Sequence, residues 1–274
     1  MTRLGVCSWS LQPESAGELV ARVRETGLSA VQLALDPVRR AEMTLAALQS
    51  ALAGAGITVV SGMMAMAGED YSTLEAIRLT GGIVPDATWE ANLAAAHANA
   101  VVAEQLGLRL VTFHAGFIPH DPFSPAYAVL LDRVRRIAGA FAERGIRVAL
   151  ETGQETAAAL LALLLGLDTT GIGVNFDPAN MILYGMGDPI AALRALGPYV
   201  AQLHVKDALP ARHVGEWGTE VPVGEGTVDW HALFGVIRAK GVALDLVIER
   251  EAGDQRIRDV RTAAALVRVH GTAA

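Results

Sequence analysis

Apolar and polar positions follow one another along the chain with two different periods. Short runs of β-branched and other apolar residues, typical of buried strands, precede segments whose apolar residues recur every three or four positions, typical of amphipathic helices. Regular repetition of this pair predicts βα units and a parallel sheet. The eight predicted strands are Leu4–Trp9, Ala30–Leu35, Ile57–Met63, Arg109–His114, Ile146–Glu151, Gly171–Asp177, Val200–Val205 and Ala243–Glu249.

Capping residues mark the ends of the intervening helices. Ser15, with Glu18 three residues later, has the spacing of a capping box, and Gly27 offers a left-handed stop before the next strand. Asp188 begins a later helix in the same way. Eight such units predict an α/β fold, a (β/α)₈ TIM barrel that forms a single domain over residues 1–274. A doubly wound open sheet is the alternative fold, but no Gly-x-Gly-x-x-Gly or phosphate-loop motif supports it.

Composition narrows the class of protein. A hydrophobic content of 52% with 19% charged residues excludes a disordered chain, and no apolar run is long enough to span a bilayer. Without a signal-peptide pattern, we expect a cytoplasmic protein with no membrane partner. The net charge of −7 argues against a nucleic-acid partner. The single cysteine, Cys7, excludes a disulfide framework. The apolar excess is compatible with a homo-oligomer.

Two connections are longer than packing requires. Ala65 to Trp89 and Lys206 to Val228 each follow a predicted strand, and the first contains a predicted short helix. In a barrel both would emerge at the carboxyl end of the strands and cover a site there. The alternative interpretation is a pair of irregular surface loops.

Four late strands end in an ionisable residue. Glu151, Asp177, His204 and Glu249 each follow an apolar run, and the carboxyl ends of barrel strands meet at one mouth. Three carboxylates in one place cannot all ionise without a compensating cation. The four residues therefore predict a divalent metal site, for Mn²⁺ first, with Mg²⁺, Co²⁺ and Zn²⁺ as the other candidates. Taken singly, each residue could instead be a solvated strand-end charge or a cap of the next helix.

Five further residues are candidates for binding a substrate. His114 ends the fourth predicted strand, Lys206 shares a strand face with the metal histidine, and Trp9 could form an apolar wall. Asn180 lies three residues after the metal aspartate, and Arg250 could hold an acidic group or pair with a neighbouring glutamate, Glu225. The alternatives are a structural histidine, a solvated lysine, a core tryptophan and ordinary turn chemistry at the asparagine.

Together the four strand-end residues resemble the metal set of the xylose-isomerase-like TIM barrels, the sugar phosphate isomerases and epimerases. Similar local phrases are Asn-Phe-Asp177-Pro-Ala-Asn180, His204-Val-Lys-Asp and Val-Ile-Glu249. Ketose 3-epimerases of this group commonly carry a histidine where this chain has Asn180, and an arginine a few residues after the metal histidine, where this chain has Lys206.

The resemblance implies a divalent-metal-dependent isomerase or epimerase of carbohydrate metabolism. Its substrate would be a small keto-sugar or sugar derivative, converted through an enediolate, with Glu151 and Glu249 as both metal ligands and catalytic proton carriers. A metal-dependent dehydratase of the inosose or keto-sugar type and a non-catalytic sugar-binding barrel are the alternatives, because one scaffold supports several chemistries.

Overall fold

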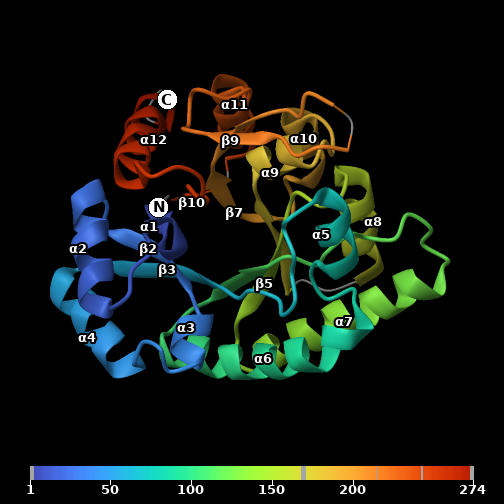
Figure 1. Cartoon of the computed structure of the whole chain (residues 1–274), viewed down its shortest axis with the longest axis horizontal. Coiled ribbons are helices and arrows are strands. Elements are labelled where there is room, and N and C mark those ends of the chain that lie inside the picture. Colours follow the sequence, from blue (N-terminus) through green and yellow to red (C-terminus); the bar gives the residue numbers. More distant parts are fainter. Residues whose placement is uncertain (1–2, 168–170, 214, 242, 272–274) are drawn as a thin grey trace.

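Eight parallel strands close into a barrel in the computed structural model (Figure 1), which describes residues 3–167, 171–213, 215–241 and 243–271. Around the barrel the order is β1, β10, β7, β6, β5, β4, β3 and β2, with β2 pairing again with β1. The bounds of these strands are β1 Leu4–Cys7, β2 Ala30–Ala34, β3 Thr58–Met63, β4 Leu110–Phe113, β5 Arg147–Glu151, β6 Ile172–Phe176, β7 Val200–Val205 and β10 Asp245–Ile248. The predicted TIM barrel and all eight predicted strands are confirmed. The outer limits of the domain stay a prediction, because residues 1–2 and 272–274 lie outside the described residues.

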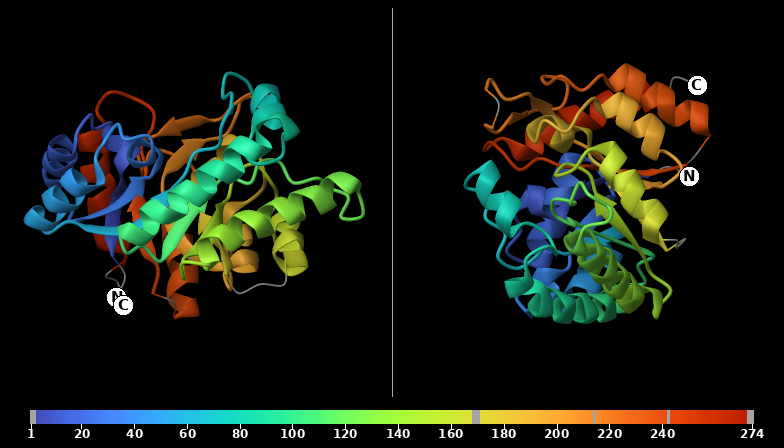
Figure 2. Two further views of the ribbon diagram at one scale, coloured as in Figure 1. Left: turned by 90° about the horizontal axis from the view of Figure 1, so that it is seen from below. Right: turned by 90° about the vertical axis from the view of Figure 1, so that its right-hand side faces the viewer.

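Helices surround the barrel on its outer side (Figures 1 and 2). They are α1 Ser8–Leu11, α2 Ala16–Thr26, α3 Asp36–Arg39, α4 Leu45–Ala55, α5 Leu74–Thr80, α6 Asp86–Gln105, α7 Pro125–Ala142, α8 Ala157–Leu167, α9 Pro178–Leu183, α10 Pro189–Leu196, α11 Trp230–Lys240 and α12 Arg256–Gly271. The predicted caps are present: the Ser15 hydroxyl accepts the backbone N–H of Glu18, and Gly27 has a φ of 76° at the end of α2. Among the described helices, none has both the length and the apolar character that crossing a bilayer requires.

The predicted first strand is too long at its carboxyl end. β1 stops at Cys7, and Trp9 lies in the short helix α1 instead of in the strand. The Ser8 hydroxyl accepts the backbone N–H of Ala34 on the neighbouring strand β2. This side-chain hydrogen bond takes the place of the backbone hydrogen bond that would continue the pairing of β1 with β2.

Strand alternation divides the buried side chains between the barrel axis and the helices. On β4, Thr112 bonds to Gln32 across the barrel interior, and its neighbour Phe113 therefore faces the helical layer. Phe113 and Phe176 of β6 are fully buried in the same apolar cluster as Phe141 of α7. This layer between strands and helices forms the main core.

Both long connections contain secondary structure of their own. The first holds α5, which begins after the Thr73 cap, and the second holds a two-stranded antiparallel hairpin of β8 Asp207–Leu209 and β9 Thr219–Val221. The connection with α5 rests on the loop that follows β4. Gly82, with a φ of 66°, lies so close to that loop that a Cβ atom would overlap the backbone of Ala115 and Gly116.

Replacing Gly82 by alanine should therefore destabilise the protein, by about 1–3 kcal/mol, because the new Cβ must displace backbone in a strained conformation. Urea unfolding followed by circular dichroism measures the change. Gly139→Ala, at an exposed position in the last turn of α7 with open space around the new Cβ, is the matched control and should stabilise by up to about 1 kcal/mol. Equal effects of the two substitutions would contradict this account of the loop contact.

Candidate metal and substrate site

Glu151, Asp177, His204 and Glu249 meet at the carboxyl mouth of the barrel. Each offers one ligand atom, and these four atoms all lie within 4.8 Å of one another. His204 Nδ1 is 3.4 Å from Glu151 Oε1, 3.5 Å from Asp177 Oδ2 and 3.3 Å from Glu249 Oε2. All four side chains are buried.

The register of the strands explains why the four meet. Glu151 ends β5 and pairs with Asn175 of β6, two residues before Asp177. His204 of β7 pairs with Val247 of β10, two residues before Glu249. Asp177 and Glu249 each follow the last residue of a strand. Asp177 also caps α9, because its Oδ1 accepts the backbone N–H of Asn180 at 2.8 Å, so the capping role and the position in the cluster belong to the same side chain.

The donor set fits a divalent cation. Asp177 Oδ2 and His204 Nδ1 are buried and have no hydrogen-bond partner within the described part of the chain. Gln32 Oε1, an acceptor, lies 2.7 Å from His204 Nε2, and Asn175 Nδ2 lies 3.0 Å from the same nitrogen. The tautomer with the proton on Nε2 satisfies the shorter contact and directs the lone pair of Nδ1 at the carboxylates. Lone pairs and carboxylate oxygens this close repel one another unless a positive charge lies among them. Three carboxylates and one imidazole are a ligand set suited to a divalent metal ion.

A second proton on His204 is the other way to supply that positive charge. Burial opposes the charged imidazole, but Glu151 and the neighbouring groups outweigh burial and raise the pKa of His204 well above its ordinary value. Burial raises the pKa of Asp177 to about 6. A cation would therefore compete with protons for these two side chains.

Cys7 also lies next to this cluster, and its sulfur, His204 and Glu249 offer ligand atoms within 4.8 Å of one another. Its Sγ is 3.8 Å from His204 Nε2, and burial raises the pKa of the thiol. A thiol held neutral in this way is a poor ligand, so the chemistry favours the three carboxylates and the histidine over any set that includes sulfur.

A layer of polar side chains inside the barrel supports the cluster from below, and sequence reasoning missed it. Short apolar runs predict strands with apolar interiors, yet five polar residues are fully buried there: Gln32, Ser61, Thr112, Asn175 and Gln202. They bond to one another and to the site: Asn175 Nδ2 donates to Glu151 Oε2 at 2.9 Å, and Gln202 donates to Asn175. The signal was present, since three of them precede a strand-end residue by two positions and share its face.

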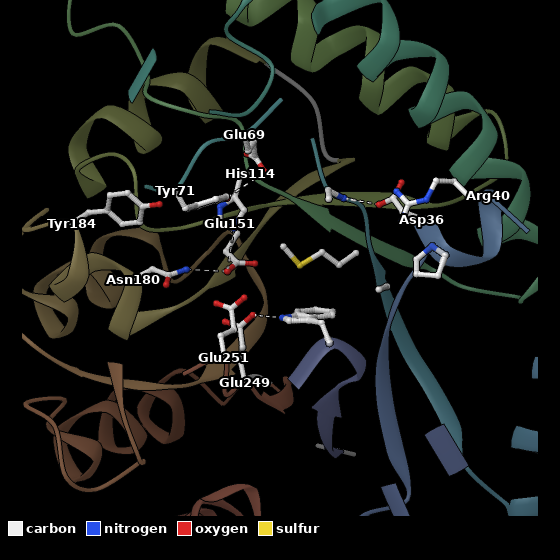
Figure 3. Close-up of a pocket in the computed structure, with 15 residues that line it drawn as sticks. Asp36, Arg40, Glu69, Tyr71, His114, Glu151, Asn180, Tyr184, Glu249 and Glu251 are labelled. Atoms are coloured by element: carbon white, nitrogen blue, oxygen red, sulfur yellow. Dashed lines mark hydrogen bonds and ion pairs between the residues drawn. The ribbon is translucent and has the colours of Figure 1, made fainter. Parts of the chain in front are cut away.

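The cluster opens into a pocket of about 680 Å³ (Figure 3). Five of the predicted site residues line this one cavity: Trp9, His114, Glu151, Asn180 and Glu249. Their contacts converge on the two glutamates.

Glu151 and Glu249 each have their own hydrogen-bond donors. Asn180 Nδ2 donates to Glu151 Oε1 at 3.0 Å, and His114 Nε2 lies 3.7 Å from the same oxygen. Trp9 Nε1 donates to Glu249 Oε1 at 2.6 Å, so this tryptophan offers more than the predicted apolar wall. Burial by itself raises the pKa of both carboxyls, but nearby positive groups outweigh it, and the pKa of each is lowered.

Lys206 and Arg250 lie beside the pocket and are both engaged. Lys206 is buried and donates to Glu249 Oε2 at 3.0 Å and to Glu251 Oε2 at 2.7 Å. Arg250 pairs with Glu220 of β9 and with a carboxylate of α12, at 2.8 Å each, and so fastens the β8–β9 hairpin to the barrel. Its partner is Glu220 and not the neighbouring Glu225 that the sequence suggested.

Several pocket residues come from segments that sequence reasoning did not single out. Glu69 and Tyr71 reach the pocket from the connection that carries α5, and Tyr184 follows α9 (Figure 3). Trp217 of the hairpin connection packs edge-on against Tyr184, with ring centroids 4.8 Å apart. Glu251 lies two residues after Glu249, and this spacing was the one available signal.

Comparison with known proteins agrees with this geometry. The model of the xylose isomerase-like TIM barrel family matches residues 20–269. The chain belongs to this family. A family relative, the xylose isomerase domain protein from Planctomyces limnophilus, is 33% identical, with 92% of this chain and 91% of that chain covered and a TM-score of 0.84.

Solved structures with lower sequence identity share the barrel fold alone. A xylose isomerase-like TIM barrel protein from Mycobacterium smegmatis, solved in complex with magnesium, is 18% identical, with 98% and 96% of the two chains covered and a TM-score of 0.71. The 3-keto-D-glucoside 4-epimerase of E. coli is 17% identical, with 98% and 100% covered and a TM-score of 0.73. No curated protein sequence matches this xylose isomerase-like barrel.

Adding Mn²⁺ should stabilise this barrel through Asp177. At a Mn²⁺ concentration about 100-fold above the dissociation constant, binding adds about 2.7 kcal/mol. That gain raises Tm by about 5–10 °C for a chain of this size. Asp177→Asn keeps the Oδ1 cap of α9 but replaces the partnerless Oδ2, and should lose most of this shift. Differential scanning calorimetry with and without Mn²⁺ measures it.

Asp188→Asn is the matched control for that experiment. Asp188 also caps a helix through Oδ1, at 2.7 Å from the backbone N–H of Ala191, but it is exposed and does not line the pocket. The control should keep the full Mn²⁺-induced shift. The same shift in Asp177→Asn and in the unmodified protein would show that Asp177 does not hold the ion.

Glu155 should make stability depend on pH without any metal. It is buried, and burial raises its pKa to about 8, above the ordinary value of 4.5. The folded protein therefore binds an extra proton between about pH 5 and pH 8, and the free energy of unfolding falls as pH rises through that window. Glu155→Gln removes the titrating group and with it this pH-dependent loss of stability. The free energy of unfolding of the variant, minus that of the unmodified protein, should therefore rise by on the order of 3 kcal/mol from pH 5 to pH 8.

Urea unfolding at the two pH values measures the difference. Glu143→Gln, at an exposed position, is the control and should show a difference that does not vary with pH. A pH-independent difference for Glu155→Gln would mean that the Glu155 carboxyl is not held neutral in the folded protein.

Proposed function

We propose that this protein is a divalent-metal-dependent isomerase or epimerase that acts on a small keto-sugar or sugar derivative through an enediolate. The observation that carries the proposal is the pair of carboxylates, Glu151 and Glu249, that lie in one buried cluster and both line the same pocket. Membership in the xylose isomerase-like family and an E. coli relative of the same fold that is a sugar epimerase support it.

Glu151, Asp177, His204 and Glu249 would hold the ion, Mn²⁺ in the first instance. When bound there, a divalent cation supplies Lewis-acid stabilisation for negative charge that develops on substrate oxygens.

The two glutamates carry the proton. One carboxylate takes the proton from the carbon next to the substrate carbonyl, and the electron pair of that C–H bond becomes the carbon–carbon double bond of the enediolate. The other glutamate takes up a proton from water and returns it to carbon. Delivery to the opposite face of the same carbon gives an epimer; delivery to the neighbouring carbon, with the hydroxyl proton passing between the two oxygens, gives an isomer. Their origin on β5 and after β10 is compatible with access from two sides.

The neighbouring side chains orient these carboxylates and the substrate. Lys206 and Trp9 hold Glu249 through its two oxygens, and Asn180 holds Glu151. His114 lines the pocket next to Glu151 and is placed to donate a hydrogen bond to a substrate oxygen. The α5 connection limits the access of water to the pocket through Glu69 and Tyr71.

Glu249→Gln should lower kcat by about 10²–10⁴, because it removes one proton carrier while it keeps a side chain of the same shape. The assay incubates the Mn²⁺-loaded protein with a panel of ketoses in D₂O and follows deuterium incorporation and product identity by NMR. Glu143→Gln, exposed and outside the pocket, should retain full activity.

Each result of this assay has a definite meaning. A product lighter by one water would identify a dehydratase instead of an isomerase. Sugars that raise Tm without any turnover would indicate a binding protein. Absence of deuterium exchange for every ketose would refute the proposed reaction.

A further inference from the structure

The charge of the pocket is strongly one-sided. Its lining includes five carboxylates, and Arg40 is the one lysine or arginine among the described lining residues. The acidic residues are Asp36, Glu69, Glu151, Glu249 and Glu251. A substrate entering this cavity meets far more hydrogen-bond acceptors than positive charges.

The cations near the pocket are already engaged by protein carboxylates. Lys206 is buried between Glu249 and Glu251 and donates to both. Arg40 donates through Nε and Nη2 to the two oxygens of Glu42, at 2.7 and 3.3 Å. To gain Lys206 as a partner, an anionic substrate group would have to break a buried charge pair, which is costly. Arg40 and Glu42 form an exposed pair, so Arg40 is the one cation of the described lining for which an anion competes at low cost, and Glu42 already neutralises its charge.

Two of the carboxylates keep free accepting capacity. Glu69 accepts the backbone N–H of Gly82 at 2.9 Å and the Tyr71 hydroxyl at 3.2 Å, and it has no lysine or arginine partner among the described residues. Glu251 shares Lys206 with Glu249, and its side chain is 53% exposed at the edge of the pocket, beside Glu249 in Figure 3. Each ionised carboxylate can accept several hydrogen bonds at once.

A divalent cation in the cluster would not reverse this balance. Its two charges match two of the three carboxylates that would hold it, and the charges of Glu69 and Glu251 lie outside that set. The electrostatic field that a distal substrate group meets is therefore negative. Such a field disfavours a phosphate or carboxylate and favours hydroxyl and ammonium groups.

We propose that this pocket selects a substrate that carries no phosphate or carboxylate, and that Glu251 and Glu69 bind its hydroxyl or amino groups. The inference rests on the proposed function in taking a sugar derivative as the substrate. Within that class it identifies a neutral or amino-bearing polyol and makes Glu251 and Glu69 the residues that determine charge selectivity. Tyr71 and Tyr184, which also line the pocket, offer aromatic faces to the C–H surface of such a molecule.

Three hexitols, two of which differ from sorbitol only in one charged terminal group, test the proposal without requiring turnover. Sorbitol is neutral, glucamine (1-amino-1-deoxysorbitol) is an ammonium near neutral pH, and sorbitol 6-phosphate is an anion. Their dissociation constants are measured by isothermal titration calorimetry on the Mn²⁺-loaded protein. Glucamine should bind at least as tightly as sorbitol, and sorbitol 6-phosphate should bind about tenfold or more weakly than sorbitol.

Substitution at Glu251 tests which residue is responsible. Glu251→Gln keeps the shape and an accepting oxygen but removes the charge, so the preference for glucamine over sorbitol should fall about fivefold or more, and the penalty on the phosphate should shrink. Glu143→Gln removes an equal charge at an exposed site outside the pocket and should leave all three ratios unchanged.

The inference is overturned if sorbitol 6-phosphate binds as tightly as sorbitol, if the ratios in Glu251→Gln match those of the unmodified protein, or if neither sorbitol nor glucamine binds. The same measurements distinguish failure of this inference from failure of the proposed function. If the expected ranking holds while no ketose exchanges deuterium, the charge selectivity stands and the isomerase assignment fails. If ketoses react but the expected ranking of the three ligands is absent, the isomerase assignment stands and the charge selectivity fails.

Discussion

Three carboxylates and an imidazole, buried within 4.8 Å of one another, impose the constraint on which the rest of this site depends. Burial strips these groups of water, so their mutual repulsion has to be balanced by a positive charge held among them. A bound dication or a proton on His204 can supply it. The lone pair of Nδ1 and the partnerless oxygen of Asp177 are both directed to the place where that charge belongs.

Much of the surrounding structure serves to hold this arrangement. Glu249 is held by Trp9 and Lys206, and Glu151 by Asn175 and Asn180. These four donors come from four different segments of the chain, and each one leaves its carboxylate less free to turn away from the cluster. Rigid placement of this kind lets acids and bases act without first paying for reorganisation.

The barrel interior and the loops above it contribute in different ways. Below the site, Gln32, Asn175 and Gln202 replace part of the apolar filling that a barrel core usually has. Gln32 and Asn175 contact His204, and Asn175 orients Glu151. Above it, the connection with α5 adds Glu69 and Tyr71, which make the pocket more acidic and more aromatic. In the proposed reaction, the lower layer would therefore position the proton-transferring groups, and the upper layer would influence which molecule enters.

The sequence by itself determined the barrel and the core of the site. The eight strands and the helices between them follow from short apolar runs and from a period of about 3.6 residues, which reflect local backbone geometry. The helix caps at Ser15 and Asp188 follow from their residue types, and the four strand-end residues follow from where the apolar runs stop. Only the tertiary structure decided that Trp9 donates to Glu249, 240 residues away, that Gln32 orients His204, 172 residues away, and that Glu251 and Glu69 share one pocket. Such contacts depend on the register and closure of the barrel and on how its loops fold back. Those are properties of strands that pair across the whole chain, and no local pattern encodes them.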